Sequence, residues 1–138
     1  MIIKPTDILP FYTENFSEAI DSIKGFCDEY TLKMLNEYVD KYRFIYFNFY
    51  GDNSFQFNFE NVEDDLYIEF YIVYFEEKSN YVLIEFKNKN RETSRLDGPA
   101  FIEISDGVLK NLVYAVDGIE YTNELQYLVT VQLKKGEK

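Results

Sequence analysis

The sequence predicts an α+β protein in which an N-terminal helical segment packs on one face of a roughly seven-stranded antiparallel meander sheet, either open or strongly curled. Up to residue 42 the apolar residues follow the 3.6-residue period of an α-helix. After Arg43 they alternate with polar residues in the period of two that is typical of β-strands. The turns between the alternating segments are too short for crossover helices, so consecutive strands should pair antiparallel. The 138 residues are expected to form a single domain, 1–138, helical over 15–42 and a sheet over 43–134.

The helical segment is expected to begin at Asn15, which has the spacing of a capping pair with Glu18. Its apolar residues at helical spacing are Phe16, Ala19, Ile20, Ile23, Cys27, Tyr30, Met34 and Tyr38. Gly25, or the stretch 28–31, is a place where the helix can kink or split. The segment therefore predicts one helix or two.

Strands are expected near 43–50, 54–60, 66–75, 81–87, 100–105, 108–116 and 125–133. Turn-forming residues at 51–53, 61–65, 77–80 and 106–107 separate most of them. One connection is longer, and its sequence NKNRETSRLDGP, residues 88–99, is polar and locally basic.

Successive side chains of a strand point to opposite faces of its sheet, so the strands can be sorted into two sets. The apolar set, which is the expected core, comprises Ile45, Phe47, Phe49, Phe55, Phe57, Phe59, Leu66, Ile68, Phe70, Ile72, Val82, Ile84 and Phe86. The opposite set comprises Tyr46, Asn48, Tyr50, Gln56, Asn58, Glu60, Tyr67, Glu69, Tyr71, Tyr81, Glu85 and Lys87, with Glu103 beyond. This second set is either a recognition surface, because tyrosines and carboxylates suit one, or a solvated face stabilised by cross-strand tyrosine pairs.

The charge distribution narrows the choice of partner. Fourteen Lys and Arg against twenty-five Asp and Glu give a net charge of −11, which disfavours direct binding to nucleic acid or to an anionic membrane. Between Arg43 and Lys78 there is no basic residue, whereas Asp52, Glu60, Glu63, Asp64, Asp65, Glu69, Glu76 and Glu77 all fall there. These acids favour a basic partner.

The composition argues against most enzyme classes. The chain has no His, and its one Cys, Cys27, has no basic neighbour that would activate it. No glycine-rich phosphate loop precedes a helix. We therefore expect no catalytic residues, no metal ligands and no cofactor. No apolar run is long enough to span a bilayer and the N-terminus lacks the pattern of a secretory signal, so a cytoplasmic location is expected.

Two carboxylate patterns leave enzyme alternatives open. Asp64 or Asp65, followed by Glu85 and Lys87, is similar to the D…ExK pattern of metal-dependent nucleases, although the acidic surroundings would repel DNA. Glu69 and Glu85 lie on strands expected to be adjacent and could act as the paired acids of a glycosidase.

The helical segment, the acidic tyrosine-rich meander and hairpins such as FIEISDGVLKNLVYAV (101–116) together resemble small acidic immunity proteins of bacterial polymorphic toxin systems. The resemblance implies a non-enzymatic protein that binds a basic partner, such as a toxin, and blocks it. The residues expected to bind the partner are Tyr46, Tyr50, Glu60, Asp64, Asp65, Tyr67, Glu69 and Tyr71.

Two other functions stay open. Seven antiparallel strands can curl into a barrel-like domain whose aromatic layer lines a pocket for an apolar small molecule. An acidic protein can also act as a DNA mimic that inhibits a nucleic-acid enzyme, provided that its carboxylates are spaced like phosphates.

Overall fold

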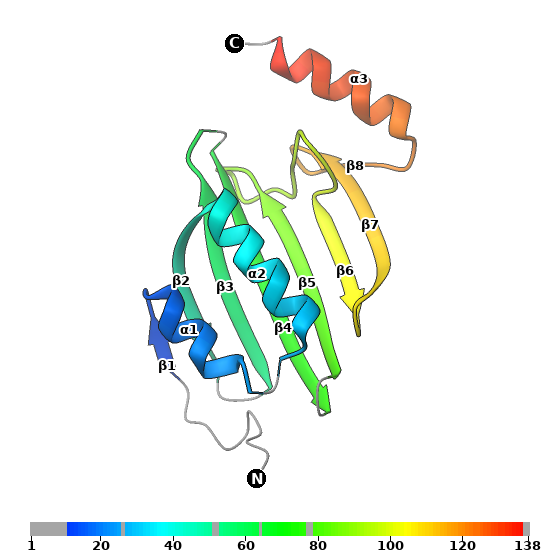
Figure 1. The fold of residues 1–138 in the computed structure, drawn as a ribbon. Coiled ribbons are helices and arrows are strands. Elements are labelled where there is room, and N and C mark those ends of the chain that lie inside the picture. The colour runs from blue at the N-terminus through cyan, green and yellow to red at the C-terminus, as the bar shows by residue number, and fades with distance from the viewer. Residues whose placement is uncertain (1–10, 26, 51–52, 64, 77–78, 137–138) are drawn as a thin grey trace.

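The alternating residues after Arg43 form an antiparallel sheet in the computed structural model (Figure 1). The structure describes residues 11–25, 27–50, 53–63, 65–76 and 79–136. Within them eight strands run in chain order, each paired antiparallel with the next: β1 (Phe11–Thr13), β2 (Arg43–Phe49), β3 (Ser54–Asn61), β4 (Leu66–Glu76), β5 (Ser79–Lys87), β6 (Phe101–Ser105), β7 (Val108–Val116) and β8 (Ile119–Tyr121). β1 and β8 are the two edges, so the sheet is not closed. The α+β class and the antiparallel meander are confirmed, with eight strands where about seven were expected.

Two helices, α1 (Phe16–Ile23) and α2 (Glu29–Lys41), cover one face of this sheet (Figure 1). The Asn15 side chain accepts a hydrogen bond from the backbone N–H of Glu18 at 3.0 Å, as the capping pair predicts. Asp28 caps α2 in the same way, accepting from the N–H of Thr31 at 2.7 Å. The helical segment predicted over 15–42 is confirmed, and it is split in two. No helix in the described part of the chain is long and apolar enough to cross a lipid bilayer.

The core lies between α1, α2 and the apolar side of β2–β5. Twelve of the thirteen predicted core residues are buried: Phe47, Phe49, Phe55, Phe57, Phe59, Leu66, Ile68, Phe70, Ile72, Val82, Ile84 and Phe86. Both helices contribute rings to it. Phe16 of α1 lies 6.0 Å from Phe57 and Tyr38 of α2 lies 5.4 Å from Phe70, measured between ring centroids, and both pairs meet edge to face. The alternation of side chains along the strands therefore correctly predicted which layer the helices cover.

The prediction that the thirteenth residue, Ile45, lies in the core is wrong. Phe44 pairs with Phe59 and Tyr46 pairs with Asn58, so the register of β2 against β3 shifts at Ile45. A bulge adds one residue to a strand, so residues before and after it no longer alternate between the two faces in the same odd-even order. Phe44 consequently packs against the core, whereas Ile45 lines a pocket on the opposite side of the sheet.

The strand predicted over 125–133 is also wrong, because this segment belongs to a third helix, α3 (Glu124–Lys135). The Asn123 side chain accepts from the N–H of Gln126 at 3.2 Å and caps the helix. Tyr127 and Val131 are each 3% exposed and pack, one helical turn apart, in a small cluster with Val116 of β7. Except for Leu128, the apolar residues of this segment stand at odd positions, and on a helix they divide between a buried side and an exposed side.

The connection 88–99 is held against both the sheet and α3. The Tyr127 hydroxyl lies 2.7 Å from the carbonyl oxygen of Arg95 and 2.8 Å from that of Gly98, and it accepts a hydrogen bond from the Gly98 N–H at 3.2 Å. The Arg95 guanidinium lies 4.0 Å from the centroid of the Phe86 ring, in a cation–π contact at the edge of the core. These contacts position the C-terminal half of the connection against β5 and α3.

Candidate functional site

The face of the sheet opposite α1 and α2 carries the polar set predicted from the sequence, and we call it the outer face. Cross-strand pairing places its members side by side: Asn48 opposite Gln56, Tyr46 opposite Asn58, Asn58 opposite Glu69, and Glu69 opposite Glu85. The polar residues of the outer face are Tyr12, Tyr46, Asn48, Tyr50, Gln56, Asn58, Glu60, Tyr67, Glu69, Tyr71, Glu85 and Lys87, and the predicted Tyr81 and Glu103, which share a hydrogen bond, lie on the same face. Tyr12, from β1, is a member that the sequence did not predict.

Two amide side chains at the centre of the outer face are buried. Gln56 is 6% exposed and Asn58 is 7% exposed. The Tyr50 hydroxyl donates to the Gln56 side-chain oxygen, and the Gln56 amide nitrogen donates to Oδ1 of Asn58 at 2.8 Å. Nδ2 of Asn58 has no hydrogen-bond partner among the described residues. A buried donor left in this state costs about 1–3 kcal/mol, so a group that accepts a hydrogen bond from it would be stabilising.

Beside the amides lies a network of charged groups centred on Lys87. Its ammonium is 2.7 Å from a carboxylate oxygen of Glu69 and 3.7 Å from one of Glu85. The Tyr71 hydroxyl donates to the other oxygen of Glu69 at 2.7 Å, and Thr93 donates to Glu85 at 2.6 Å. Burial tends to raise the pKa of Glu69, but the hydrogen bonds from Lys87 and Tyr71 outweigh it and the pKa is lowered. Glu69 and Glu85 are adjacent, as expected, and both form ion pairs with Lys87.

The exposed part of the outer face consists mainly of tyrosines. Tyr12 is 55% exposed, Tyr50 51% and Tyr67 45%. Tyr46 is less exposed and stacks on Tyr12 with 5.5 Å between ring centroids. None of these four rings is buried beneath another part of the described chain, so Tyr46, Tyr50 and Tyr67 of the predicted contact residues are accessible. Tyr71, the fourth predicted tyrosine, is partly buried, and its hydroxyl is bound to Glu69.

The predicted acids are placed in three ways. Glu69 lies in the Lys87 network, and Glu60 forms an ion pair with Arg43 at 3.1 Å. Asp65 is exposed in the turn between β3 and β4, with a backbone φ of 53°. Asp64 lies outside the described residues. The structure thus brings Glu60 and Glu69 onto the outer face with the tyrosines, and places Asp65 at the end of the strands.

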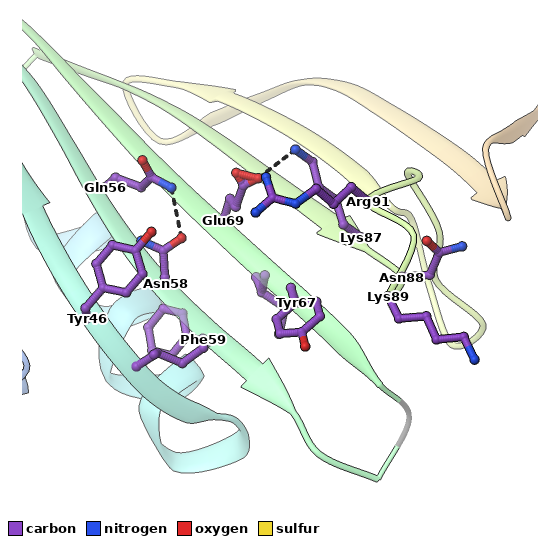
Figure 2. A pocket seen from close by; sticks show the side chains of 12 residues that line it. Tyr46, Gln56, Asn58, Phe59, Tyr67, Glu69, Lys87, Asn88, Lys89 and Arg91 are labelled. Atoms are coloured by element: carbon purple, nitrogen blue, oxygen red, sulfur yellow. Dashed lines mark hydrogen bonds and ion pairs between the residues drawn. The ribbon is translucent and has the colours of Figure 1, made fainter.

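A pocket of about 480 Å³ opens on the outer face (Figure 2). β2, β3 and β4 supply its floor, and the turn that follows β5 supplies one wall. The lining residues are Ile45, Tyr46, Gln56, Asn58, Phe59, Tyr67, Ile68, Glu69, Lys87, Asn88, Lys89 and Arg91. Its volume lies within the range of about 300–1,000 Å³ that is usual for small-molecule sites.

The turn 88–92 holds two cations at the rim of this pocket. Oδ1 of Asn88 accepts hydrogen bonds from the N–H groups of Asn90 and Glu92 at 2.9 and 3.0 Å, and the Arg91 N–H donates to the Asn88 carbonyl at 2.9 Å. Arg91 has a φ of 63°, which the tight turn requires. Lys89 and Arg91 were not predicted as site residues. The locally basic composition of 88–99 was the only indication of these two cations in the sequence. It does not show on which face of the sheet the turn lies.

The residues of the nuclease-like pattern do not lie together, and Cys27 is buried. Glu85 and Lys87 of the nuclease-like pattern lie on the outer face, whereas Asp65 is in the β3–β4 turn. Among the described residues no group of three or more His, Cys, Asp or Glu is arranged to hold a metal ion. Cys27 is buried, and burial raises the pKa of its thiol to about 12, so the thiol is protonated at neutral pH.

Comparisons with protein-family models, curated proteins and solved structures found no match to this chain. The fold belongs to the α+β class, with an antiparallel meander that is not closed. Its candidate site is the outer face of β1–β5, together with the pocket in it.

The lowered pKa of Glu69 predicts a pH dependence of stability. The ionised carboxylate stabilises the folded state above the pKa of an unfolded glutamate, about 4.3, and this contribution is lost as the pH falls through the lower folded value. Glu69→Gln should therefore reduce the free energy of unfolding at pH 7, by an amount that shrinks towards about pH 3. Urea titrations at pH 7, 5 and 3 measure this difference. Glu63→Gln, at an exposed residue, is the control, and a loss that did not change with pH would contradict the ion-paired role.

Proposed function

We propose that this chain is a non-enzymatic binding module that docks a basic protein on the outer face of its sheet. The observation that supports this most strongly is the exposure of Tyr12, Tyr50 and Tyr67 on the face that α1 and α2 leave free. Tyrosine gives a large contact area with little loss of side-chain entropy, and it is enriched at the energetic centres of protein interfaces. The buried side chain of Gln56 accepts a hydrogen bond from the Tyr50 hydroxyl and so helps to fix this ring.

Charge favours a basic partner. The chain carries a net charge of −11, and Glu63 and Asp65 are exposed in the turn that joins β3 to β4. Carboxylates at the edge of a docking surface attract a cationic partner and accelerate association. Glu60 and Glu69 already have cationic partners in the free chain, so we assign the attraction to Glu63 and Asp65, and the rigidity of the surface to the paired acids.

The partner that we propose is a toxin, in line with the small acidic immunity proteins that the chain resembles. Such a protein blocks its toxin by covering it and needs no catalytic group. Tyr46, Tyr50, Tyr67 and Tyr71 are the proposed contact residues.

Affinity capture from an extract of the source cells tests this proposal. Immobilised wild-type chain is compared with the double variant Tyr67→Ser/Glu63→Lys on the outer face. We expect the wild type to retain a protein of basic isoelectric point, and the double variant to retain at least roughly tenfold less, because it loses one contact ring and reverses one steering charge. Binding should also weaken as the salt concentration rises.

The control carries the same two changes on the helical side of the molecule, Tyr30→Ser/Glu37→Lys, where Tyr30 is 48% exposed. A further variant, Leu125→Ser/Leu133→Ser, removes two exposed apolar residues of α3. Both should capture the basic protein as the wild type does. Loss of capture in either of them, with full capture by the outer-face variant, would contradict the proposal.

A further inference from the structure

The pocket on the outer face contains a hydrogen-bond donor that no other part of the described chain uses. Asn58 is 7% exposed, its Oδ1 accepts from Gln56, and its Nδ2 is unpartnered. Cross-strand pairing places Asn58 between Tyr46 and Glu69, and neither of these side chains accepts from it. A buried amide of this kind points to an acceptor atom supplied from outside.

The charges around this donor favour a negatively charged acceptor. Three cations, Lys87, Lys89 and Arg91, line the pocket, together with a single carboxylate, that of Glu69. Lys87 is engaged by Glu69 and Glu85. Lys89 and Arg91 form no ion pair with any described residue. Burial raises the pKa of Glu69, Lys87 and Tyr71 lower it, and the charge of Arg91 lowers it by a smaller amount. Figure 2 shows Lys87 and Arg91 next to Glu69, which lies between them and the two amides, and Lys89 farther away near Asn88.

Apart from the amides Gln56 and Asn88, the remaining lining is apolar or aromatic. Tyr46 and Tyr67 contribute rings from two strands, and Ile45 is turned into the pocket by the bulge in β2. A ligand that used all of these groups would carry one anionic group on a flat or apolar body. Glu69 disfavours a dianion such as phosphate, because a second negative charge would meet a carboxylate in the same pocket.

We propose that this pocket binds a small organic carboxylate, with one carboxylate oxygen accepting from Nδ2 of Asn58, Arg91 and Lys89 neutralising the charge, and the body of the ligand lying against Tyr46 and Tyr67. Binding is reversible and involves no covalent step. The inference goes beyond the docking of a basic protein and does not depend on it, since it rests on groups that are left unpartnered in the chain by itself.

Titration of the ¹⁵N-labelled full chain with sodium benzoate tests the site. The side-chain amide signal of Asn58 should shift saturably, with a dissociation constant on the order of 1 mM, as expected for a ligand of this small size. Benzamide has the same ring without the charge and should bind at least roughly tenfold more weakly. Inorganic phosphate should also bind more weakly than benzoate.

Two variants assign the effect to the pocket. Asn58→Asp keeps an acceptor for Gln56 but removes the free donor, and Arg91→Gln removes a rim cation. Each should weaken benzoate binding at least roughly tenfold, read from the side-chain amide signal of Gln56, which both variants keep. Arg43→Gln is the matched control, since it removes a cation of β2 that does not line the pocket, and it should leave binding unchanged. If Asn58→Asp does not fold, Arg91→Gln carries the comparison.

Three results would overturn the inference: no saturable shift at Asn58, equal affinity for benzamide and benzoate, or tighter binding of phosphate than of benzoate. Because the titration needs no protein partner, its outcome is separate from that of the capture experiment. Benzoate can fail to bind the pocket while the outer face still captures a basic protein, and benzoate can bind while capture fails. The two experiments distinguish these cases.

Discussion

Phe57→Ala is expected to lower the free energy of unfolding by about 3–5 kcal/mol, which is much of the 5–15 kcal/mol that a domain of ordinary stability has. Phe57 is 0% exposed and lies in the middle of β3. Its ring centroid is 4.7 Å from that of Phe47, 6.0 Å from that of Phe16 and 6.5 Å from that of Phe70. The substitution removes a ring that joins β2, β4 and α1, and the fully buried neighbours cannot collapse into the space without strain.

Equilibrium denaturation in urea measures this effect. The control is Tyr67→Ala, which removes a ring of similar size from the exposed side of β4 and should change the free energy of unfolding by less than about 1 kcal/mol. Equal losses in the two variants would show that the aromatic layer under the helices is not the closely packed core of the protein.

Tyr127→Ala is expected to have the second largest effect, about 3 kcal/mol, and to act on one region rather than on the whole fold. Tyr127 is 3% exposed, and its ring centroid lies 4.8 Å from that of Tyr114 and 6.4 Å from that of Tyr121. Its hydroxyl also ties α3 to the 88–99 connection through Arg95 and Gly98. Without this side chain, α3 keeps Val131 as its remaining residue in the cluster and should separate from β7 and β8.

Hydrogen–deuterium exchange, read by residue, locates the loss. The amides of α3 and of the 88–99 connection should exchange faster in Tyr127→Ala, while those of β3 and β4 stay protected. Leu128→Ala, on the exposed side of the same helix, should leave the exchange of α3 nearly unchanged. Uniformly faster exchange across the sheet would contradict the local role of Tyr127.

The central strands could be predicted from the sequence because burial there is one-sided. Along β3 the residues Phe55, Phe57 and Phe59 alternate with Gln56 and Asn58, so parity identifies both the helix-covered layer and the outer face. The two helices were predictable for a similar reason, since their caps and apolar stripes agree. Local pattern and tertiary environment indicate the same structure in this part of the chain.

The C-terminal helix could not be predicted in the same way. Leu125, Tyr127, Val129, Val131 and Leu133 have the period of two of a strand, yet only Tyr127 and Val131 are buried and the other three are exposed. On a helix these two buried residues are four positions apart and share one side, which the small cluster requires. The exposed apolar residues therefore produced a misleading periodicity.

The candidate site was predictable in its tyrosines, its amides and Lys87, but not in the two cations of the turn after β5. Tyr46, Asn58 and Glu69 follow from strand parity, whereas Lys89 and Arg91 reach the outer face through the turn after β5. That turn is fixed by hydrogen bonds of the Asn88 side chain, which composition alone does not reveal. Ile45 was misplaced because a bulge has no reliable signal in a run of apolar residues.

The proposed function requires that the outer face is the surface that contacts the partner. Its most direct test is to add the captured basic protein to the ¹⁵N-labelled chain and to map the perturbed backbone signals. We expect the largest changes at Tyr50, Tyr67 and the β3–β4 turn, with the signals of α1 and α3 nearly unaffected. Changes confined to α1 and α2, or to α3, with the outer face unperturbed, would contradict it.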